Sequence, residues 1–386
     1  MKTSNPQVIK LLRDLVRIDS QNPGSGETEI IDFIAKYLAK FGVASRIYEF
    51  ESGRPNLVCR LQSRHSKKTL LLTPHVDTVP AGQGWKFPPF SGKLHQGKIY
   101  GRGATDCKSN VAVAMQVIRN LKEKKAVLEN LDLIFAFCAD EETGSYYGTI
   151  PLVKKLKNID YGLVLDADEF DIVFAQKGLF HLRVELFGKA SHGAFPERGV
   201  NAIEKGVRIL AAIMDQGFSY QSHPLLVKPT LNVGRFYGGE KVNMVADRAV
   251  FDLDIRYLPG MDIKKILRGI EAIIKKQKIK YRTEVLASQE PIEKNTNSFL
   301  IRLLMESLRE NKIKPKLTAS FGATVINFLQ DEGIDTFAFG FGSHKNAHVV
   351  NECVAIKNLG LGARVLEDYL MRLDRFLADK GEESAR

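Results

Sequence analysis

Four short apolar runs that end near a histidine or a carboxylate constrain the fold of this chain more than any other feature. They are LLLT before His75, LDLIFAF from Leu131 to Phe137, GLVL before Asp166, and TFAFGFG from Thr336. Short apolar runs bounded by turn residues are typical of buried strands. Segments with helical periodicity lie between them, and strands that alternate with helices indicate an α/β layer architecture.

The first of these runs ends in HVD, which places an imidazole and a carboxylate two residues apart. In an extended chain His75 and Asp77 point to the same face. A ligating imidazole usually has its other ring nitrogen held by a carboxylate or a carbonyl. Asp106 stands before the apolar helical run Val111–Leu121, where it could also serve as an ordinary helix N-cap.

Three consecutive acids, Asp140, Glu141 and Glu142, follow the second run. Like charges this close raise one another's pKa, so they need either solvent or a cation. A solvated loop would tolerate them. A bound metal ion would instead require carboxylates and relieve their repulsion, and this reading predicts a base beside a metal ligand.

The remaining runs supply further candidate ligands. Asp166 and Asp168 follow the third run on the same face, so spacing does not choose between them. The fourth run enters a glycine-rich turn with His344, His348 and Glu352. Imidazole and carboxylate ligands without thiolates suit zinc, cobalt or manganese. A carboxylate shared by two ions is the usual two-metal arrangement.

Taken in order, these blocks resemble the M20 metallopeptidases. The matching residues are His75-x-Asp77 with Pro80, Gly101-Arg102-Gly103 with Asp106 and Lys108, Glu141-Glu142-x-Gly144, Asp166 and His348. That family comprises co-catalytic zinc hydrolases, among them acetylornithine deacetylase, succinyl-diaminopimelate desuccinylase, aminoacylase-1 and glutamate carboxypeptidase. The resemblance covers nearly the whole chain.

The resemblance implies a role for each matching residue. Asp106 would bridge two zinc ions, with cobalt or manganese as alternatives. His75 and Asp166 would complete one site, and Glu142 and His348 the other. Asp77 would orient His75, and Glu141 would be the general base acting on a metal-bridging hydroxide. The family's D-Y pattern favours Asp166 over Asp168, and its spacer before Glu favours His348 over His344.

Four further positions follow from the same resemblance. His192 would donate to the oxyanion from a partner subunit, and Asn243 and Arg256 would hold a substrate carboxylate. The alternatives are that His192 is an ordinary loop histidine and that Arg256 is an exposed charge on a strand. Thr324 lies where the family has a substrate loop, yet the aspartate usual there is missing. The block after Asp106 also departs from the family pattern at Cys107 and Ser109.

The pattern changes near residue 177. The segment 177–289 reads β-α-β-β-α-β, a two-layer α+β sandwich. In relatives this module is a lid and dimerisation domain. We therefore expect a discontinuous catalytic domain, residues 1–176 and 290–386, with a mixed sheet flanked by helices and interrupted by the sandwich.

These observations predict an enzyme, a metal-dependent amidohydrolase that cleaves the amide bond of an N-acyl amino acid. The W-x-x-x-P-F block from Trp85 to Phe90 resembles the deacetylase and desuccinylase branch. A dipeptidase or carboxypeptidase acting on short peptides is the alternative within the family. A non-catalytic metal-binding protein is a further alternative, against which the presence of Glu141 argues.

Composition narrows the partners and the compartment. The net charge of +11 is spread over amphipathic helices, without an arginine-rich arm or nucleic-acid motif. We therefore expect no nucleic-acid partner. Four cysteines without framework spacing predict reduced thiols and a cytoplasmic protein. The N-terminal segment has no signal-peptide pattern, and without a long apolar stretch no membrane association is expected. Family resemblance predicts a homodimer.

Overall fold

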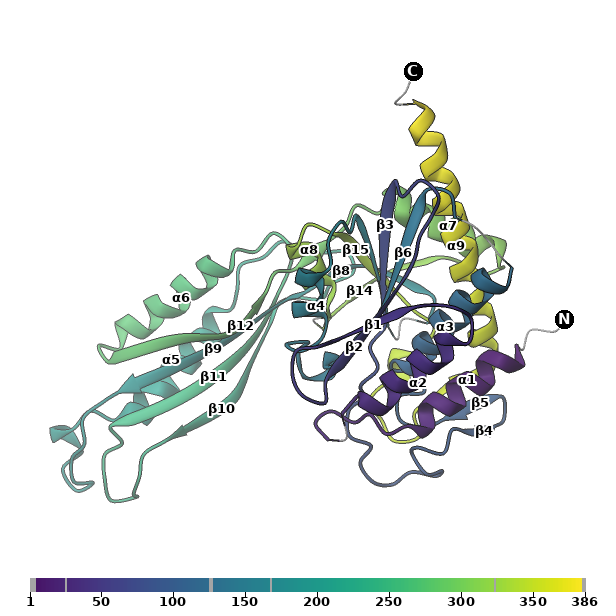
Figure 1. Ribbon diagram of the computed structural model, residues 1–386. Coiled ribbons are helices and arrows are strands. Elements are labelled where there is room, and N and C mark those ends of the chain that lie inside the picture. Colours follow the sequence, from purple (N-terminus) through teal and green to yellow (C-terminus); the bar gives the residue numbers. More distant parts are fainter. Residues whose placement is uncertain (1–4, 25, 125–127, 167–168, 323, 384–386) are drawn as a thin grey trace. The chain divides into compact units, whose positions relative to one another are not determined.

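The computed structural model describes residues 5–24, 26–124, 128–166, 169–322 and 324–383 (Figure 1). Its chain divides into two compact units. Unit 1 runs to Phe174, resumes over Lys294–Thr318 and resumes again after residue 323. Unit 2 comprises Ala175–Glu293 and a short stretch that begins at Ala319.

Unit 1 is built on a mixed sheet. In spatial order its strands are β1 (Ser45–Glu49), β2 (Pro55–Leu61), β6 (Leu131–Phe137), β3 (Lys68–Thr73), β7 (Tyr161–Leu165), β15 (Asp335–Phe339) and β8 (Asp171–Gln176), with β14 (Lys316–Ser320) also pairing with β8. Strand β13 (Ile292–Glu293) pairs with Ala175 and Gln176, the last two residues of β8. The four strands β6, β3, β7 and β15 run parallel to their neighbours in this group. Strands β2 and β8 join this group in antiparallel fashion.

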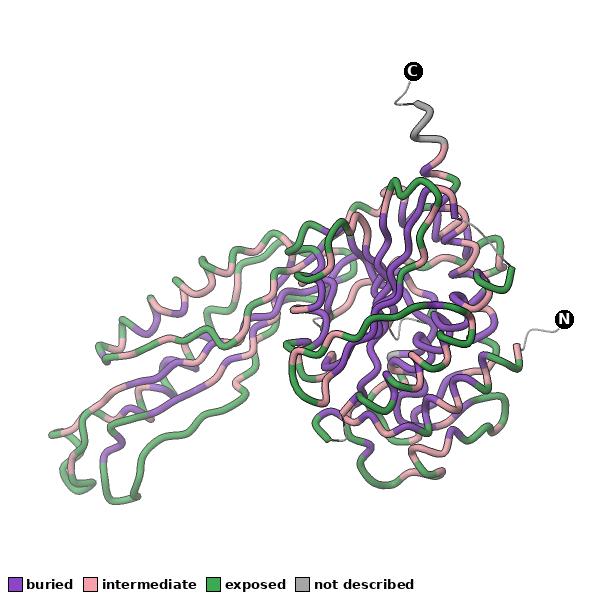
Figure 2. Tube along the Cα trace, viewed as in Figure 1, coloured by how far each residue is buried: buried purple, intermediate pink, exposed green. Residues whose placement is uncertain are grey.

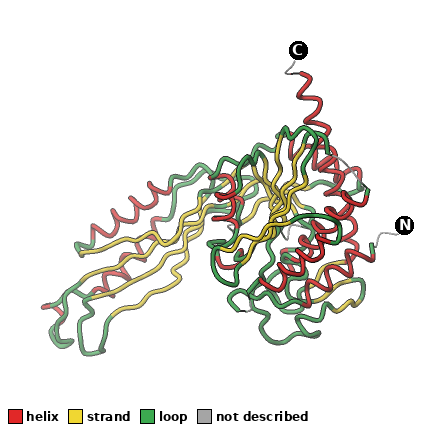
Figure 3. Tube along the Cα trace, in the orientation of Figure 1, coloured by secondary structure: helices red, strands yellow, loops and turns green. Residues whose placement is uncertain are grey.

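Helices cover both faces of this sheet (Figures 1 and 3). They are α1 (Pro6–Arg17), α2 (Thr28–Ala39), α3 (Lys108–Glu123), α4 (Thr149–Lys155), α7 (Phe299–Glu310), α8 (Ile326–Asp331) and α9 (Ile356–Glu383). Helix α3 packs against α1 and α9, whereas α4 packs against α8. Strands β4 (Lys93–His95), β5 (Lys98–Tyr100) and β16 (Cys353–Ala355) form a small separate sheet.

The central parallel strands are apolar because both of their faces are covered. Every residue of β6 is buried, and β3 and β7 are buried after their first residue (Figure 2). All four apolar runs recognised in the sequence form strands of this group. The predicted mixed α/β architecture is therefore confirmed.

Unit 2 is a four-stranded antiparallel sheet with two helices. Its strands lie in the order β10 (Thr230–Gly238), β11 (Arg248–Tyr257), β9 (Gly178–Phe187) and β12 (Lys280–Gln289), and its helices are α5 (Ala202–Gln216) and α6 (Ile263–Lys276). Alternate residues of β9, such as Leu182 and Val184, pack in one buried cluster with Ile209 of α5 and Ile273 of α6. The chain order β9-α5-β10-β11-α6-β12 matches the β-α-β-β-α-β pattern expected from the sequence.

Two further observations bear on the expectations from composition. All four cysteines are free and buried. Within the described residues, no helix is both long and apolar enough to cross a membrane.

Candidate metal centre

The candidate site lies where three neighbouring parallel strands end. Strand β3 leads to His75, β6 leads to the acidic segment 140–142, and β7 leads directly to Asp166. These strands are adjacent in the order β6-β3-β7, so their carboxyl ends meet at one edge of the sheet. That edge is where ligands bind in open α/β sheets. A parallel bridge between His75 and Cys138 extends the pairing of β3 with β6 as far as the site.

Asp106 stands at the centre of the site, between two histidines. Its Oδ1 lies 3.0 Å from His75 Nε2, and its Oδ2 lies 3.2 Å from His348 Nε2. His348 Nε2 also lies 3.1 Å from Glu142 Oε2. The N-cap of α3 is Cys107, so capping that helix is not the role of Asp106. Burial opposes ionisation of Asp106, but the hydrogen bonds from His348 and His75 prevail and hold its pKa below the usual range.

Asp77 is fully buried and ties His75 to the two glutamates. It accepts the backbone N–H of Glu141 at Oδ1 and that of Glu142 at Oδ2, each at 3.1 Å. The carboxamide of Asn22 donates to the same carboxylate at 3.0 Å. His75 Nδ1 lies 3.1 Å from the carbonyl oxygen of Asp77 and 3.4 Å from its Oδ1. The Asp77 carboxylate thus contacts the His75 imidazole and holds the backbone of Glu141 and Glu142.

The third acid of the segment, Asp140, holds the loop rather than facing the histidines. Its φ of 63° lies in the left-handed region. Its side chain accepts hydrogen bonds from Asn22 at 3.2 Å, from the backbone of Tyr147 at 3.0 Å and from the Thr143 hydroxyl. The bent backbone and these three donors turn the chain so that Glu141 and Glu142 follow at the sheet edge.

The two glutamates sit among further carboxylates. Burial, with the charges of Asp166, Glu142 and Asp77 in support, raises the pKa of Glu141 well above its usual value. The pKa of Glu142 is also raised, first by burial and then by the charge of Asp106. This excess of carboxylates over basic groups is what a bound cation would offset.

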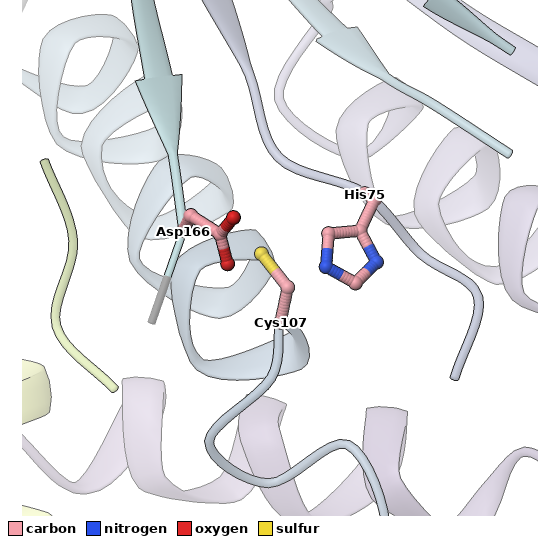
Figure 4. Close-up of side chains that lie close together, drawn as sticks. All are labelled: His75, Cys107 and Asp166. Atoms are coloured by element: carbon pink, nitrogen blue, oxygen red, sulfur yellow. The ribbon is translucent and has the colours of Figure 1, made fainter. Parts of the chain in front are cut away.

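The donor atoms fit a divalent metal. Ligand atoms of His75, Asp106 and Glu142 all lie within 4.8 Å of one another, and those of His75, Cys107 and Asp166 form a second such group (Figure 4). Imidazole nitrogens and carboxylate oxygens are the ligands of catalytic zinc and of related first-row cations. His75 belongs to both groups.

A buried ion pair connects two of the loops that carry candidate ligands. Arg102 Nη1 lies 2.7 Å from Glu352 Oε2, and both side chains are buried. Glu352 Oε1 accepts the backbone N–H of Thr105 at 2.9 Å and that of Asp106 at 3.1 Å. Arg102 also donates to the carbonyl of Val349, at 3.3 Å, one residue beyond His348. The pair therefore joins the Asp106 loop to the His348 loop.

Comparison with protein-family models shows which family this chain belongs to. The model of peptidase family M20/M25/M40 matches residues 71–372, which include all the residues discussed above except Asn22. The chain belongs to the M20 peptidase family. It is therefore a metal-dependent hydrolase, and the prediction of an M20 metallohydrolase is confirmed.

Individual relatives span almost the whole chain. A metallohydrolase of Methanococcus maripaludis is 28% identical over 96% of this chain and all of the relative. An acetylornithine deacetylase of Vibrio atlanticus is 28% identical over 90% of this chain and 93% of the relative. Among solved structures, a Staphylococcus aureus tripeptidase superposes with a TM-score of 0.79 at 23% identity, covering 97% of this chain and all of that one. This last likeness concerns the fold.

The other predicted site residues belong to both units of the chain. In unit 2, exposed His192 pairs with Met244 in an antiparallel bridge, and the Gly193 N–H donates to the Asn243 carbonyl at 2.8 Å. Arg256, on β11, donates to the Asp254 carboxylate at 2.8 and 3.2 Å.

In unit 1, Thr324 accepts the Ile326 N–H at 3.4 Å where α8 begins. Asp168, the alternative to Asp166, lies outside the described residues.

Sequence reasoning missed several residues that shape the centre. Asn22 carries no local signal, since it contacts Asp77 and Asp140 from 55 and 118 residues away. Arg102 and Glu352 stand within the recognised motifs, but nothing local pairs them across 250 residues. Cys107 was noted only as a departure from the family pattern, and the expectation of ligands without thiolates did not anticipate a sulfur beside His75.

Proposed function

We propose that this M20 hydrolase removes an acyl group from an N-acylated amino acid, as a deacetylase or desuccinylase does, with two divalent cations. Zinc is the first choice of metal, and cobalt and manganese are the alternatives. One observation carries the proposal: the two oxygens of Asp106 face different histidines, His75 and His348. A carboxylate placed in this way suits two ions that share it.

The residues would divide between two subsites. His75 and Asp166 would hold one cation, Glu142 and His348 the other, and Asp106 both. When bound, such a pair of cations supplies Lewis acidity, which polarises the scissile carbonyl and acidifies an attacking water. Asp77 would keep His75 in place, because a carboxylate or carbonyl behind a ligating imidazole fixes the orientation of the ring.

Glu141 would act as the base. Its backbone N–H is held by Asp77, and its carboxylate would take a proton from water and later pass it to the leaving amine. A general base of this kind contributes ~10²–10⁴-fold to the rate. The resemblance adds His192, from the partner in a homodimer, as a donor to the developing oxyanion.

Substrate recognition in the proposal rests on Arg256 and Asn243, with Thr324 in the segment that matches the family's substrate loop. Arginine suits a carboxylate because it can donate two parallel hydrogen bonds. Arg256 makes such a pair of hydrogen bonds with Asp254 of its own chain. The free carboxylate of an N-acyl amino acid would be the corresponding group of the substrate.

The test is a substrate panel with the metal-loaded full-length protein: N-acetylornithine, N-succinyl-diaminopimelate, N-acetylmethionine and several dipeptides. We expect metal-dependent hydrolysis with a preference for one acylated amino acid. Faster turnover of dipeptides would move the assignment to the peptidase alternative. No hydrolysis by protein that carries two metal ions would contradict the proposed substrate class.

A substitution tests the base separately. Glu141→Gln should lower kcat by ~10²-fold or more while metal stoichiometry stays unchanged. Exposed Glu332→Gln is the matched control and should behave as the wild type. To test the partner's role, mixed Glu141→Ala and His192→Ala proteins should regain activity through hybrid dimers. Confirmed subunit exchange without recovery would count against His192.

A further inference from the structure

A thiol lies within the candidate metal centre. Cys107 Sγ, a ring nitrogen of His75 and a carboxylate oxygen of Asp166 are all within 4.8 Å of one another. Figure 4 shows the sulfur directed into the space between the carboxylate and the imidazole. The three residues come from three different segments, so their convergence is a product of the tertiary fold.

Two hydrogen bonds fix the position of the Cys107 sulfur. The residue is fully buried at the N-cap of the 16-residue helix α3. The Asn110 carboxamide donates to Sγ at 3.5 Å, and Sγ itself is hydrogen-bonded to the carbonyl of Leu165 at 3.0 Å. Leu165 precedes Asp166, so this contact keeps the sulfur beside the carboxylate.

The other cysteines of the chain differ in this respect. All four are free and buried, as structural thiols often are. Among the described residues, only Cys107 belongs to a group of histidine, cysteine and acidic side chains whose ligand atoms converge. A role in core packing therefore accounts for Cys59, which lies on β2. It does not account for the position of Cys107 beside His75 and Asp166.

We propose that Cys107 is a ligand of the cation held by His75 and Asp166. The two subsites then differ: one offers nitrogen, oxygen and sulfur, and the other, with Glu142 and His348, offers only nitrogen and oxygen. The inference rests on the proposed two-cation function. Coordination forms a metal–sulfur bond, breaks the S–H bond and releases one proton to solvent.

If Cys107 is a ligand, the two subsites should differ in their preference for zinc over manganese. Thiolate is a soft ligand that selects zinc and similar ions, whereas carboxylate and water suit manganese and magnesium. We expect the sulfur-containing subsite to reject manganese more strongly than the other.

Cobalt provides a readout that does not depend on catalysis. The metal-free full-length protein is loaded with Co²⁺, the bound cobalt is counted by elemental analysis, and the near-ultraviolet spectrum is recorded. We expect a sulfur-to-cobalt charge-transfer band in the wild type, lost in Cys107→Ser and retained in the matched buried variant Cys59→Ser. The zinc-over-manganese preference of Cys107→Ser should fall by about tenfold or more.

The outcomes separate the two proposals. Two bound cobalt ions without a sulfur band in the wild type would overturn the cysteine ligand and leave the two-cation hydrolase standing. A band that survives in Cys107→Ser would overturn it as well. Failure of the wild type to bind cobalt would overturn both. Because the wild-type spectrum alone can refute the proposal, the test does not depend on the folding of a variant.

Discussion

The buried pair between Arg102 and Glu352 should be essential to the stability of unit 1. Replacing Glu352 by Gln keeps an oxygen that can accept the N–H groups of Thr105 and Asp106. It removes the negative charge that lies 2.7 Å from the Arg102 guanidinium. The arginine would then be a buried cation whose remaining partners are carbonyl oxygens.

The expected cost follows from this geometry. The two side chains are 3% and 1% exposed, so solvent cannot replace the lost partner. Breaking a buried pair by removing one partner costs ~3–5 kcal/mol, which is the loss we expect for Glu352→Gln. Glu352→Ala should cost more, because the N–H groups of Thr105 and Asp106 also lose their acceptor, at ~1–3 kcal/mol each.

The fluorescence of Trp85 can follow unfolding close to Arg102. Trp85 is the only tryptophan of the chain, and its ring centroid lies 5.3 Å from the Arg102 guanidinium carbon. Urea unfolding followed by its fluorescence therefore reports on this part of unit 1. Asp32→Asn is the control, since Asp32 pairs with Lys36 at 4.0 Å in solvent and should contribute less than ~1 kcal/mol. A loss in Glu352→Gln no larger than in this control would refute the reasoning.

Two further predictions concern stability. Burial raises the pKa of Glu27 from 4.5 to about 7, so the folded state binds its proton more tightly than the unfolded state. Stability should thus fall by up to ~3 kcal/mol as pH rises from about 4.5 to about 7, and urea midpoints of Glu27→Gln should lack this slope. A Cβ at Gly340 would overlap the Asp166 carbonyl, so Gly340→Ala should lose more than ~3 kcal/mol in thermal unfolding. Gly269→Ala, on α6 with space for a methyl group, should gain up to ~1 kcal/mol, and equal effects would contradict the clash.

Local pattern was enough to predict the elements. The run from Leu131 to Phe137 became β6, buried at every residue, because a strand whose side chains are apolar on both faces needs both faces covered. Residues 177–289 showed strand alternation and helical periodicity in an order that the four-stranded unit reproduces. Both signals depend on neighbours in the chain, which sequence displays directly.

The sequence also placed the main site residues at strand ends. Because β6, β3 and β7 are parallel neighbours, His75, Glu142 and Asp166 had to reach the same edge of the sheet. The ordered motifs then supplied Asp106 and His348 through family resemblance, and the structure brings these two to 3.2 Å of each other.

The tertiary structure alone decided how the centre is held and what else enters it. Asp140 resembles its two acidic neighbours in sequence, yet its backbone conformation and its donors, Asn22 among them, make it a support of the loop. Glu352 meets Arg102 across 250 residues, and Cys107 meets His75 and Asp166 across three segments. The sequence determined which side chains could bind a metal, because that depends on residue type and local period. Which of them face one another depends on contacts that close long loops, and no local pattern records those contacts.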